Sequence, residues 1–307
     1  MTFSATTLAF WNIGEGSASA AQTTKLINNQ SVALNVASIG MSNPDYAETD
    51  NCVGTVPARG TCTITVTLTP SVLGTDNGTL TVTDNASTSP QSVTLNGTSI
   101  LPVVLSGPSL GFGNVAQSTA SSPKTLTLSN RETVALTLRT ITTGNPDFAE
   151  SDTCNGSVAA KGSCVITITF TPSVIGAETG TLTVNDTASN TPQTAALTGT
   201  GLSQAALAPT SLTFATQKAG TPSGQKAVTL TNNLTTALAV SGISFGGADP
   251  GDFSETDNCV GNVAAKSSCT IRVTFTPGAT GSRAGTLQVA DSANNSPQTI
   301  PLTGTGD

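Results

Sequence analysis

The chain has 307 residues, a length that allows two or three domains of ordinary size. Only 9% of the residues are charged, and a net charge of −7 with no run of Lys or Arg argues against electrostatic docking on nucleic acid or on an anionic membrane. No stretch approaches the ~20 apolar residues that a membrane-spanning helix requires, so no membrane insertion is expected.

One passage occurs three times along the chain. Asn-Pro-Asp-Phe-Ala-Glu-Ser-Asp precedes Cys154, and close variants precede Cys52 and Cys259, so the copies are 102 and 105 residues apart. A repeat of this length is too long for a solenoid unit, so each copy should have its own hydrophobic core and fold alone. We therefore expect three successive domains. Their ranges are residues 1–99, 100–201 and 202–307.

Each copy begins with two short strand patterns. Where two large apolar residues mark a pattern they occupy alternate positions, as expected for a strand with one buried face. The first pattern comprises Leu8/Phe10, Leu110/Phe112 and Leu212/Phe214, and the second comprises Leu26, Leu126/Leu128 and Val228/Leu230.

An acidic segment follows in each copy. Half of the 18 acidic residues fall in these three segments, which are Asp45/Glu48/Asp50, Asp147/Glu150/Asp152 and Asp252/Glu255/Asp257. Clustered carboxylates can bind Ca²⁺, but their spacing matches no familiar calcium loop. One cation follows each segment, at Arg59, Lys161 or Lys266. We expect surface ion pairs and turn capping here, with a metal site as the alternative.

The six cysteines form one Cys-x9-Cys pair in each copy. Pairing inside a copy is the only scheme that keeps the copies equivalent, so we expect three disulfides and an oxidising compartment. Two cysteines per copy and no histidine anywhere fall short of a four-coordinate zinc site. The expected bonds are Cys52–Cys62, Cys154–Cys164 and Cys259–Cys269.

The strand after the second cysteine alternates most regularly. Its inward face in the second copy is Cys164, Ile166, Ile168 and Phe170, and a Thr-Pro ends it, because proline cannot donate to a central ladder. Two further strands complete each copy, one with Leu182 and Val184 or their counterparts and one ending in Gly-Thr-Gly or a variant. No window shows helical periodicity. About seven antiparallel strands per copy predict an all-β, immunoglobulin-like sandwich.

The joints between copies are expected to be short. Residues 100–105 and 205–209 have the pattern of an opening strand rather than of a free linker, which predicts a semi-rigid rod. The chain begins without the basic and apolar regions of a signal peptide. We expect either that an export signal has been removed or that the chain is a segment of a longer array.

The ordered motifs resemble a known domain family. Asp147-Phe148, Cys-x9-Cys, Phe170-Thr171-Pro172, Gly-Thr-Leu-Thr-Val from Gly180 and a closing Leu-Thr-Gly-Thr-Gly are similar to the ASPM–SPD-2–Hydin (ASH) type of immunoglobulin-like domain, called choice-of-anchor D in bacterial surface and secreted proteins. The first copy departs slightly, with Leu68 and Tyr46 at two of the Phe positions. The resemblance implies a major-sperm-protein-like sandwich with a scaffolding, adhesion or spacing role, and the cysteine pairs favour the extracellular bacterial branch.

Catalysis has few candidate groups. The chain has no histidine, and its carboxylate clusters recur in all three copies, so we expect no enzyme activity and no cofactor. Trp11, the only tryptophan, is expected to fill the rim of the first sandwich or to contact another module or chain.

We therefore expect an extracellular structural protein: a stalk, a spacer or a head-to-tail filament subunit. The alternative is an adhesin or a module that binds carbohydrate or protein. The expected partners are other copies of the chain or neighbouring modules, with a surface glycan or protein as a further ligand. The opening strand of one chain would lie near the closing strand of the chain before it. The candidate contact residues are Phe3, Phe10, Trp11, Thr299, Ile300 and Leu302.

Overall fold

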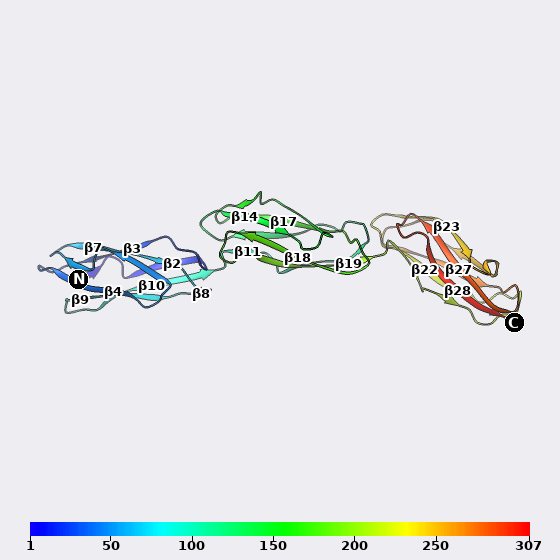
Figure 1. The fold of residues 1–307 in the computed structure, drawn as a ribbon, viewed down its shortest axis with the longest axis horizontal. Helices are drawn as coiled ribbons and strands as arrows, with labels where there is room; N and C mark the ends of the chain where they lie inside the picture. The colour runs from blue at the N-terminus through cyan, green and yellow to red at the C-terminus, as the bar shows by residue number, and fades with distance from the viewer.

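The structure is a computed structural model that describes all 307 residues. Three β-sandwich units lie end to end along an elongated molecule, and the two chain termini lie at its opposite ends (Figure 1). The third unit is inclined to the other two (Figure 1). The predicted all-β, immunoglobulin-like fold is confirmed.

The first unit is a sandwich of a four-stranded and a six-stranded sheet. Its strands are β1 (Thr2–Phe3), β2 (Thr7–Gly14), β3 (Gln22–Ile27), β4 (Leu34–Met41), β5 (Tyr46–Asp50), β6 (Gly54–Val56), β7 (Thr61–Leu68), β8 (Gly74–Thr75), β9 (Gly78–Asp84) and β10 (Gln91–Ile100). The smaller sheet has the order β1-β3-β7-β5, and the larger has the order β2-β10-β9-β4-β6 with β8 paired to β10.

The second unit repeats this arrangement. Its strands are β11 (Val103–Leu105), β12 (Ser109–Ala116), β13 (Lys124–Asn130), β14 (Leu136–Thr142), β15 (Phe148–Asp152), β16 (Ser157–Val158), β17 (Ser163–Phe170), β18 (Gly176–Asp186) and β19 (Gln193–Leu202). The sheet orders are β11-β13-β17-β15 and β12-β19-β18-β14-β16. The single long strand β18 corresponds to the two strands β8 and β9 of the first unit.

The third unit has the same topology with one added turn. Its elements are β20 (Ala205–Ala208), β21 (Leu212–Thr213), β22 (Lys226–Asn232), β23 (Leu238–Gly246), η1 (Pro250–Asp252), β24 (Phe253–Asp257), β25 (Gly261–Val263), β26 (Ser268–Phe275), β27 (Gly281–Asp291) and β28 (Gln298–Gly306). The sheet orders are β20-β22-β26-β24 and β21-β28-β27-β23-β25. The short 3-10 turn η1 is the only helical segment, and no helix in the structure is long and apolar enough to cross a bilayer.

The strand alternation read from the sequence is present in the sheets. In β17, Ile166, Ile168 and Phe170 are completely buried, whereas the intervening residues are exposed or half-buried. Strands β7 and β26 show the same pattern, and all three strands end two residues before a proline. Burying one face of each sheet against the other is the main favourable contribution to folding in a unit of this size.

Each unit has a separate hydrophobic core. The three clusters contain 16, 17 and 19 buried residues, and they lie within residues 8–95, 103–197 and 205–302. Aromatic rings fill the centre, as where Phe148 and Phe170 stack with their centroids 4.6 Å apart. Because no core cluster crosses from one unit to the next, each sandwich is stabilised by its own contacts.

In the larger sheet of each unit, the strand that comes first in the chain (β2, β12 or β21) pairs in parallel with the closing strand (β10, β19 or β28). The sequence predicted only antiparallel pairing. Leu8 pairs with Leu95 in β10, and Leu110 and Leu212 pair with Leu197 and Leu302 in the later units. Alternation within a strand shows which face is buried but not which strand lies beside it. The parallel pair lets the closing strand of one unit end beside the start of the next.

Candidate functional site

Three recurring features are candidates for function: the cysteine hairpins, the acidic segments and the joints. We call the end of a unit that faces the N-terminal side of the molecule its head and the opposite end its tail. The head loops are residues 28–33, 130–135 and 232–237, and the tail loops are residues 70–76, 172–178 and 277–283. The two joints lie between the tail of one unit and the head of the next (Figure 1).

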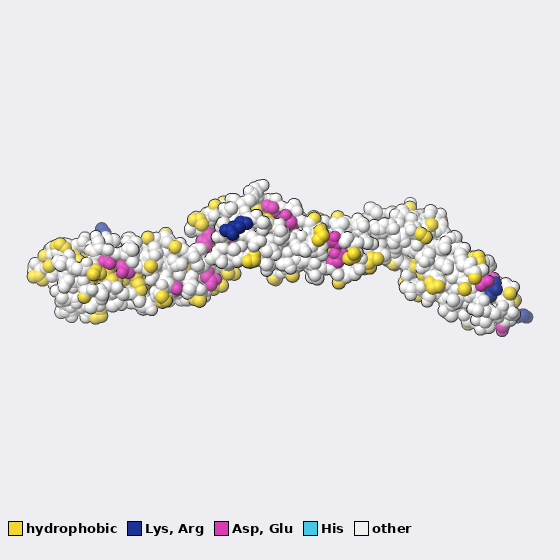
Figure 2. Space-filling model, in the orientation of Figure 1, with side chains coloured by type: hydrophobic (Ala, Val, Ile, Leu, Met, Phe, Trp, Pro, Cys, Tyr) yellow, Lys and Arg dark blue, Asp and Glu magenta, His cyan; other side chains and the backbone are white.

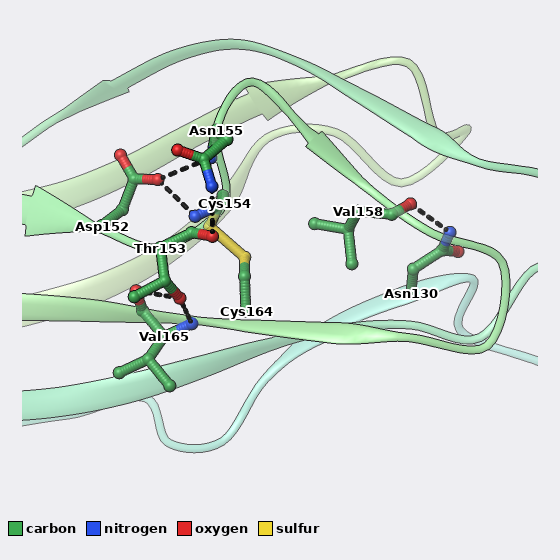
Figure 3. The surroundings of a disulfide bond; sticks show 8 residues. All are labelled: Asn130, Asp152, Thr153, Cys154, Asn155, Val158, Cys164 and Val165. Carbon is green, nitrogen blue, oxygen red and sulfur yellow. Dashed lines mark hydrogen bonds between the residues drawn. A yellow bond between two sulfur atoms is a disulfide. The ribbon is translucent and has the colours of Figure 1, made fainter.

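The cysteines pair within each unit, as the repeats predict. Each bond ties the loop after one edge strand (β5, β15 or β24) to the neighbouring central strand (β7, β17 or β26), and Cys154–Cys164 is drawn in Figure 3. The cysteines are mostly buried, so the bonds are part of the core. The Cα–Cα distances are 5.1 Å for Cys52–Cys62, 5.0 Å for Cys154–Cys164 and 5.2 Å for Cys259–Cys269.

The last acid of each segment caps the turn that contains the first cysteine. Asp152 Oδ1 accepts hydrogen bonds from the backbone N–H of Cys154, at 2.6 Å, and of Asn155, at 3.3 Å (Figure 3). Asp50 and Asp257 cap the equivalent turns. The predicted turn capping is therefore present.

The predicted ion pairs within the cysteine loops are wrong. Arg59, Lys161 and Lys266 adopt positive φ angles of 55–58° in a tight turn, and no ion pair joins them to the acids. The ammonium groups donate instead to the preceding head loop, Lys161 to the carbonyl of Arg131 at 2.5 Å and Lys266 to that of Asn233 at 2.7 Å. The physical reason is that an exposed carboxylate attracts a lysine only weakly in water, so a nearby carbonyl is an equal partner.

The middle acids face inward at the sheet edges. Burial raises the pKa of Glu48, Glu150 and Glu255, with the neighbouring Asp of each segment as a second cause. These residues lie on β5, β15 and β24, which are edge strands of the smaller sheets. An inward-pointing charge on an edge strand opposes pairing with a further strand, so these acids protect the edges from strand addition.

A buried asparagine in each unit joins the head loop to the cysteine hairpin, and the sequence analysis missed it. The Asn130 Nδ2 group lies within 2.9–3.1 Å of the carbonyls of Val134, Val158 and Ala159, and one of these contacts is drawn in Figure 3. Its Oδ1 accepts from the N–H of Glu132 at 2.9 Å. Asn28 and Asn232 make the same set of contacts. The recurrence of asparagine at this position in all three copies is the sequence feature that could have identified these residues.

The first joint contains direct contacts between side chains and backbone of two units. Only Leu101 and Pro102 separate β10 from β11. Ser17 Oγ of the first unit donates to Glu132 Oε1 of the second at 2.8 Å, and Ser189 Oγ donates to the carbonyl of Glu15. A Cβ atom on Gly14 would overlap the Glu132 carboxylate, so a larger residue there would displace the Glu132 side chain from its present position.

The second joint uses one glutamine as its centre. Gln204 lies in the two-residue link between β19 and β20. Its Nε2 donates to the carbonyl of Gln117 in the second unit at 2.9 Å, and its Oε1 accepts from the N–H of Asn294 in the third at 2.8 Å. The backbone of the link is also bonded, since the Asn233 N–H and side-chain amide of the third unit donate to the carbonyls of Gln204 and Ser203, both at 2.9 Å.

The predicted end-to-end contact needs correction. Phe10, Ile300 and Leu302 are at most 2% exposed and belong to the cores, so their side chains are not free for another chain. Thr299 is exposed, but it lies at the start of β28 next to the head of the third unit, away from the free tail. Phe3 is half-buried against the first core.

Trp11 does not fill the rim of the first sandwich. Its side chain is 57% exposed on β2, three residues before Gly14 of the first joint. Of the six contact residues read from the sequence, Trp11 and Thr299 are therefore the two whose side chains are available at the surface. Contact with another chain remains a prediction for these residues.

Two family models match the chain. The model described as "Abnormal spindle-like microcephaly-assoc'd, ASPM-SPD-2-Hydin" (ASH) matches residues 201–299, and the "HYDIN/CFA65/VesB-like, Ig-like domain" model matches residues 104–200. No curated protein matches the chain.

Solved structures show low similarity in sequence and superposition. The ASH/PapD-like domain 7 of human CEP192 is 18% identical, covering 34% of this chain and 85% of that one, with a TM-score of 0.26. The I67–I69 fragment of titin is 11% identical over 100% and 98% of the two chains, with a TM-score of 0.29. Protocadherin gamma B7 domains 1–4 are 12% identical over 99% and 75%, with a TM-score of 0.31. Values this low support no inference about function.

The repeats, the sandwich topology and the matched ranges agree with one another. The chain is a tandem array of immunoglobulin-like domains, in which residues 104–200 belong to the HYDIN/CFA65/VesB-like family and residues 201–299 to the ASH family.

Proposed function

We propose that the chain is an extracellular structural protein, a semi-rigid spacer that holds whatever adjoins its two ends at a fixed separation. The observation that carries this proposal is the construction of the joints. Each link is two residues long. Hydrogen bonds join the two flanking units across the first joint and join the link to its neighbouring units at the second. A flexible linker needs free backbone, and these links have little of it.

The disulfides support an extracellular location. Three bonds, each buried at the edge of a core, are typical of proteins that fold in an oxidising compartment. The composition agrees, since only 9% of the residues are charged, and few charged side chains lie on the face drawn in Figure 2. We place the boundaries of the three units at residues 99 and 201, each within two residues of the end of a closing strand.

The dimensions suit a spacer. The longest strands have 11 residues and therefore extend about 35 Å, so three units in line span on the order of 110 Å. The proposed role is non-enzymatic, because the recurring aspartates accept backbone hydrogen bonds in every unit and do not converge on one cleft.

Loosening a joint tests the proposal. Ten Gly and Ser residues inserted between Leu101 and Pro102 would separate the first two units without altering either core. Electron microscopy of single molecules should give a narrow distribution of angles between these units in the parent and a broad one in the insertion variant. An equally broad distribution in the parent would contradict a spacer function. Free thiols in protein secreted by its source would contradict the extracellular assignment.

A second candidate function is ligand binding at the second joint. A pocket of about 480 Å³ lies there, lined by Lys124 of the second unit, Lys266 of the third, neutral polar residues and four hydrophobic residues, with no acidic residue. Lys266 Nζ is held by its bond to the Asn233 carbonyl. Two cations and several amide and hydroxyl groups suit a small carboxylated sugar.

Glucuronate is the probe for this candidate. Its binding, followed by NMR, should be lost in the double variant K124A/K266A and kept in K218A, which removes an exposed lysine at the far tail. Equal binding by all three proteins, or no binding by the parent, would exclude the pocket as a carboxylated-sugar site.

A further inference from the structure

Three polar side chains meet beside the tail loop of every unit, and their charges differ between units. We call each group a tail triad. The triads are Asn43/Asp45/Asp76, Asn145/Asp147/Glu178 and Asp249/Asp252/Arg283. In each, the second member is the first acid of the acidic segment, and the third is the last residue of the tail loop.

The third unit contains an ion pair at this position. Arg283 contacts Asp252 Oδ2 through Nε at 2.5 Å and Asp249 Oδ1 through a terminal nitrogen at 2.7 Å. Asp252 Oδ1 also accepts from the N–H of Gly278 in the tail loop at 3.0 Å. The hydrogen bond from Arg283 is the largest cause that lowers the pKa of Asp252. This triad is satisfied within the chain.

The first unit has a carboxyl group where the third has arginine. Asp76 is 5% exposed and lies within hydrogen-bonding reach of the Asp45 carboxyl. Asn43 donates to its Oδ1 at 2.5 Å, but its buried Oδ2 has no partner. Asp45 Oδ2 accepts from the N–H and the hydroxyl of Ser71, at 2.8 and 2.9 Å, and so holds the tail loop.

The second unit repeats this pairing with a longer side chain. Glu178 lies within hydrogen-bonding reach of Asp147, and its buried Oε1 has no partner. Asp147 Oδ2 accepts from the N–H of Ser173 at 2.5 Å, which again holds the tail loop. Two neighbouring carboxylates cannot both be ionised without cost.

The change between units involves two positions together. The third unit replaces the amide of Asn43 or Asn145 by Asp249 and replaces the second carboxyl by Arg283. Its triad therefore carries its own cation, whereas the other two contain a pair of acids and a neutral amide. No cationic side chain of those triads takes the place of Arg283.

We propose that the carboxyl pairs Asp45–Asp76 and Asp147–Glu178 each bind one proton, on Asp76 Oδ2 and Glu178 Oε1, and that acid thereby strengthens the tails of the first two units. The bound proton supplies the donor that each orphaned oxygen lacks and forms a hydrogen bond to the partner carboxylate. Arg283 fulfils this role permanently in the third unit.

No cationic side chain is among the groups that shift the pKa of Asp76 or of Glu178. Around Asp76 the groups that alter its charge state are Asn43 and Asp45, and the only other titratable neighbour is the Tyr46 phenol. Burial, with the charges of Asp76 and Asp45, raises the pKa of that phenol to about 12, so it stays neutral. Glu178 is affected by Asp147, by Asn145 and by the backbone at Val174.

The direction of the pH effect follows from these environments. Burial is the largest cause that raises the pKa of Asp76 and of Glu178 above their ordinary values of 3.8 and 4.5. A raised folded-state pKa gives stability that is complete below the ordinary value and is lost as pH rises through the raised one. Asp252, whose pKa is lowered, behaves oppositely, because its contribution is present at neutral pH and is lost in acid.

The variants D76N and E178Q mimic the protonated carboxyls in the full chain. At neutral pH each should raise the melting temperature of its unit by roughly 4 °C or more, and the gain should vanish near pH 4. R283Q is the matched opposite, since it should lower the melting temperature of the third unit at neutral pH. If D76N and E178Q destabilise their units at neutral pH, the proposal is wrong.

Carbon-13 NMR titration of the parent is independent of any variant. The carboxyl carbons of Asp76 and Glu178 should titrate above 3.8 and 4.5, whereas that of Asp252 should titrate below 3.8. Ordinary titration of Asp76 and Glu178 would overturn the proposal. Addition of CaCl₂ at neutral pH should leave the melting temperatures unchanged, and a rise confined to the first two units would show that the pairs bind a metal cation instead.

Discussion

Asn28, at the head of the first unit, has a role that its neighbour Asn29 lacks. The Asn28 amide is completely buried and donates to three carbonyls, whereas Asn29 is exposed and contacts only the hydroxyl of Thr2. Buried carbonyls that lose their donor retain the full cost of leaving water. The residue therefore fixes the head loop against the cysteine hairpin.

We predict that N28A destabilises the first unit by about 2–3 kcal/mol. For a unit of this size the melting temperature should fall by roughly 10 °C. N29A is the matched control and should change it by no more than a degree or two. Differential scanning calorimetry of the full chain would measure both, and similar melting temperatures for the two variants would show that the buried contacts contribute nothing.

The burial of a residue and its disulfide pairing are predictable from the sequence when the pattern that reveals them is local or repeated. The alternation of Ile166, Ile168 and Phe170 needs only the two-residue period of a strand, and the cysteine pairs need only their recurrence. The partners of Asn130 lie up to 29 residues away, so no local pattern reveals them. Lys161 failed as an ion-pair partner because the geometry of its turn, not its distance along the chain from Asp152, decides which oxygen it reaches.

At the scale of the element, the closing strands depend on glycine for packing. Gly199 in β19 faces the ring of Phe170 so closely that an added Cβ would overlap it, and Gly304 faces Phe275 in the same way. The closing Gly-Thr-Gly motif of the sequence is therefore a packing requirement, in which the glycine makes room for the central aromatic ring of the core.

We predict that G199A destabilises the second unit by about 1–3 kcal/mol, the usual cost of overpacking a core. G111A, on the adjacent strand β12, places its Cβ at ordinary van der Waals distance from Thr198 and should be almost neutral. Chemical denaturation of the full chain, followed by circular dichroism, would compare them. Equal stability of G199A and the parent would mean that Phe170 moves freely, against a close-packed core.

The disulfides act on the same scale. Each closes a short loop at the edge of a sandwich, with a sequence separation of 10 residues. We predict that replacing Cys154 and Cys164 by alanine destabilises the second unit by about 3 kcal/mol. Non-reducing peptide mapping of the parent should recover three links, each inside one unit. Recovery of any link between units, or a double variant as stable as the parent, would contradict this role.

Strand identity was predictable, but strand neighbours were not. The apolar patterns around Leu110, Leu126 and Ile166 correspond to β12, β13 and β17. The parallel pairing of β12 with β19 joins residues more than 80 positions apart. The sequence of neither strand indicates which strand it pairs with. Ile100, read as part of the opening strand of the next unit, belongs to β10, because an apolar residue between two strands fits the pattern of either one.

At the scale of the molecule, the two joints have different hydrogen bonds but the same two-residue link between a closing strand and the next opening strand. Glu132 receives a hydrogen bond across the first joint, and Gln204 bonds to both flanking units at the second. Both joints follow from a closing strand that runs almost directly into the next opening strand, which sets neighbouring units end to end (Figure 1). The short joints were predictable from the sequence, whereas the contacts that fix them are not visible in any repeat pattern.

The central claim is that these joints keep the three units extended in solution, and small-angle X-ray scattering of the parent chain tests it most directly. A rod of about 110 Å has a radius of gyration of about 33 Å, whereas a compact globule of the same length of chain has one of about 19 Å. We predict the larger value, with a pair-distance distribution that has a long tail. A radius near the smaller value would show that the units fold back on one another and would contradict the spacer.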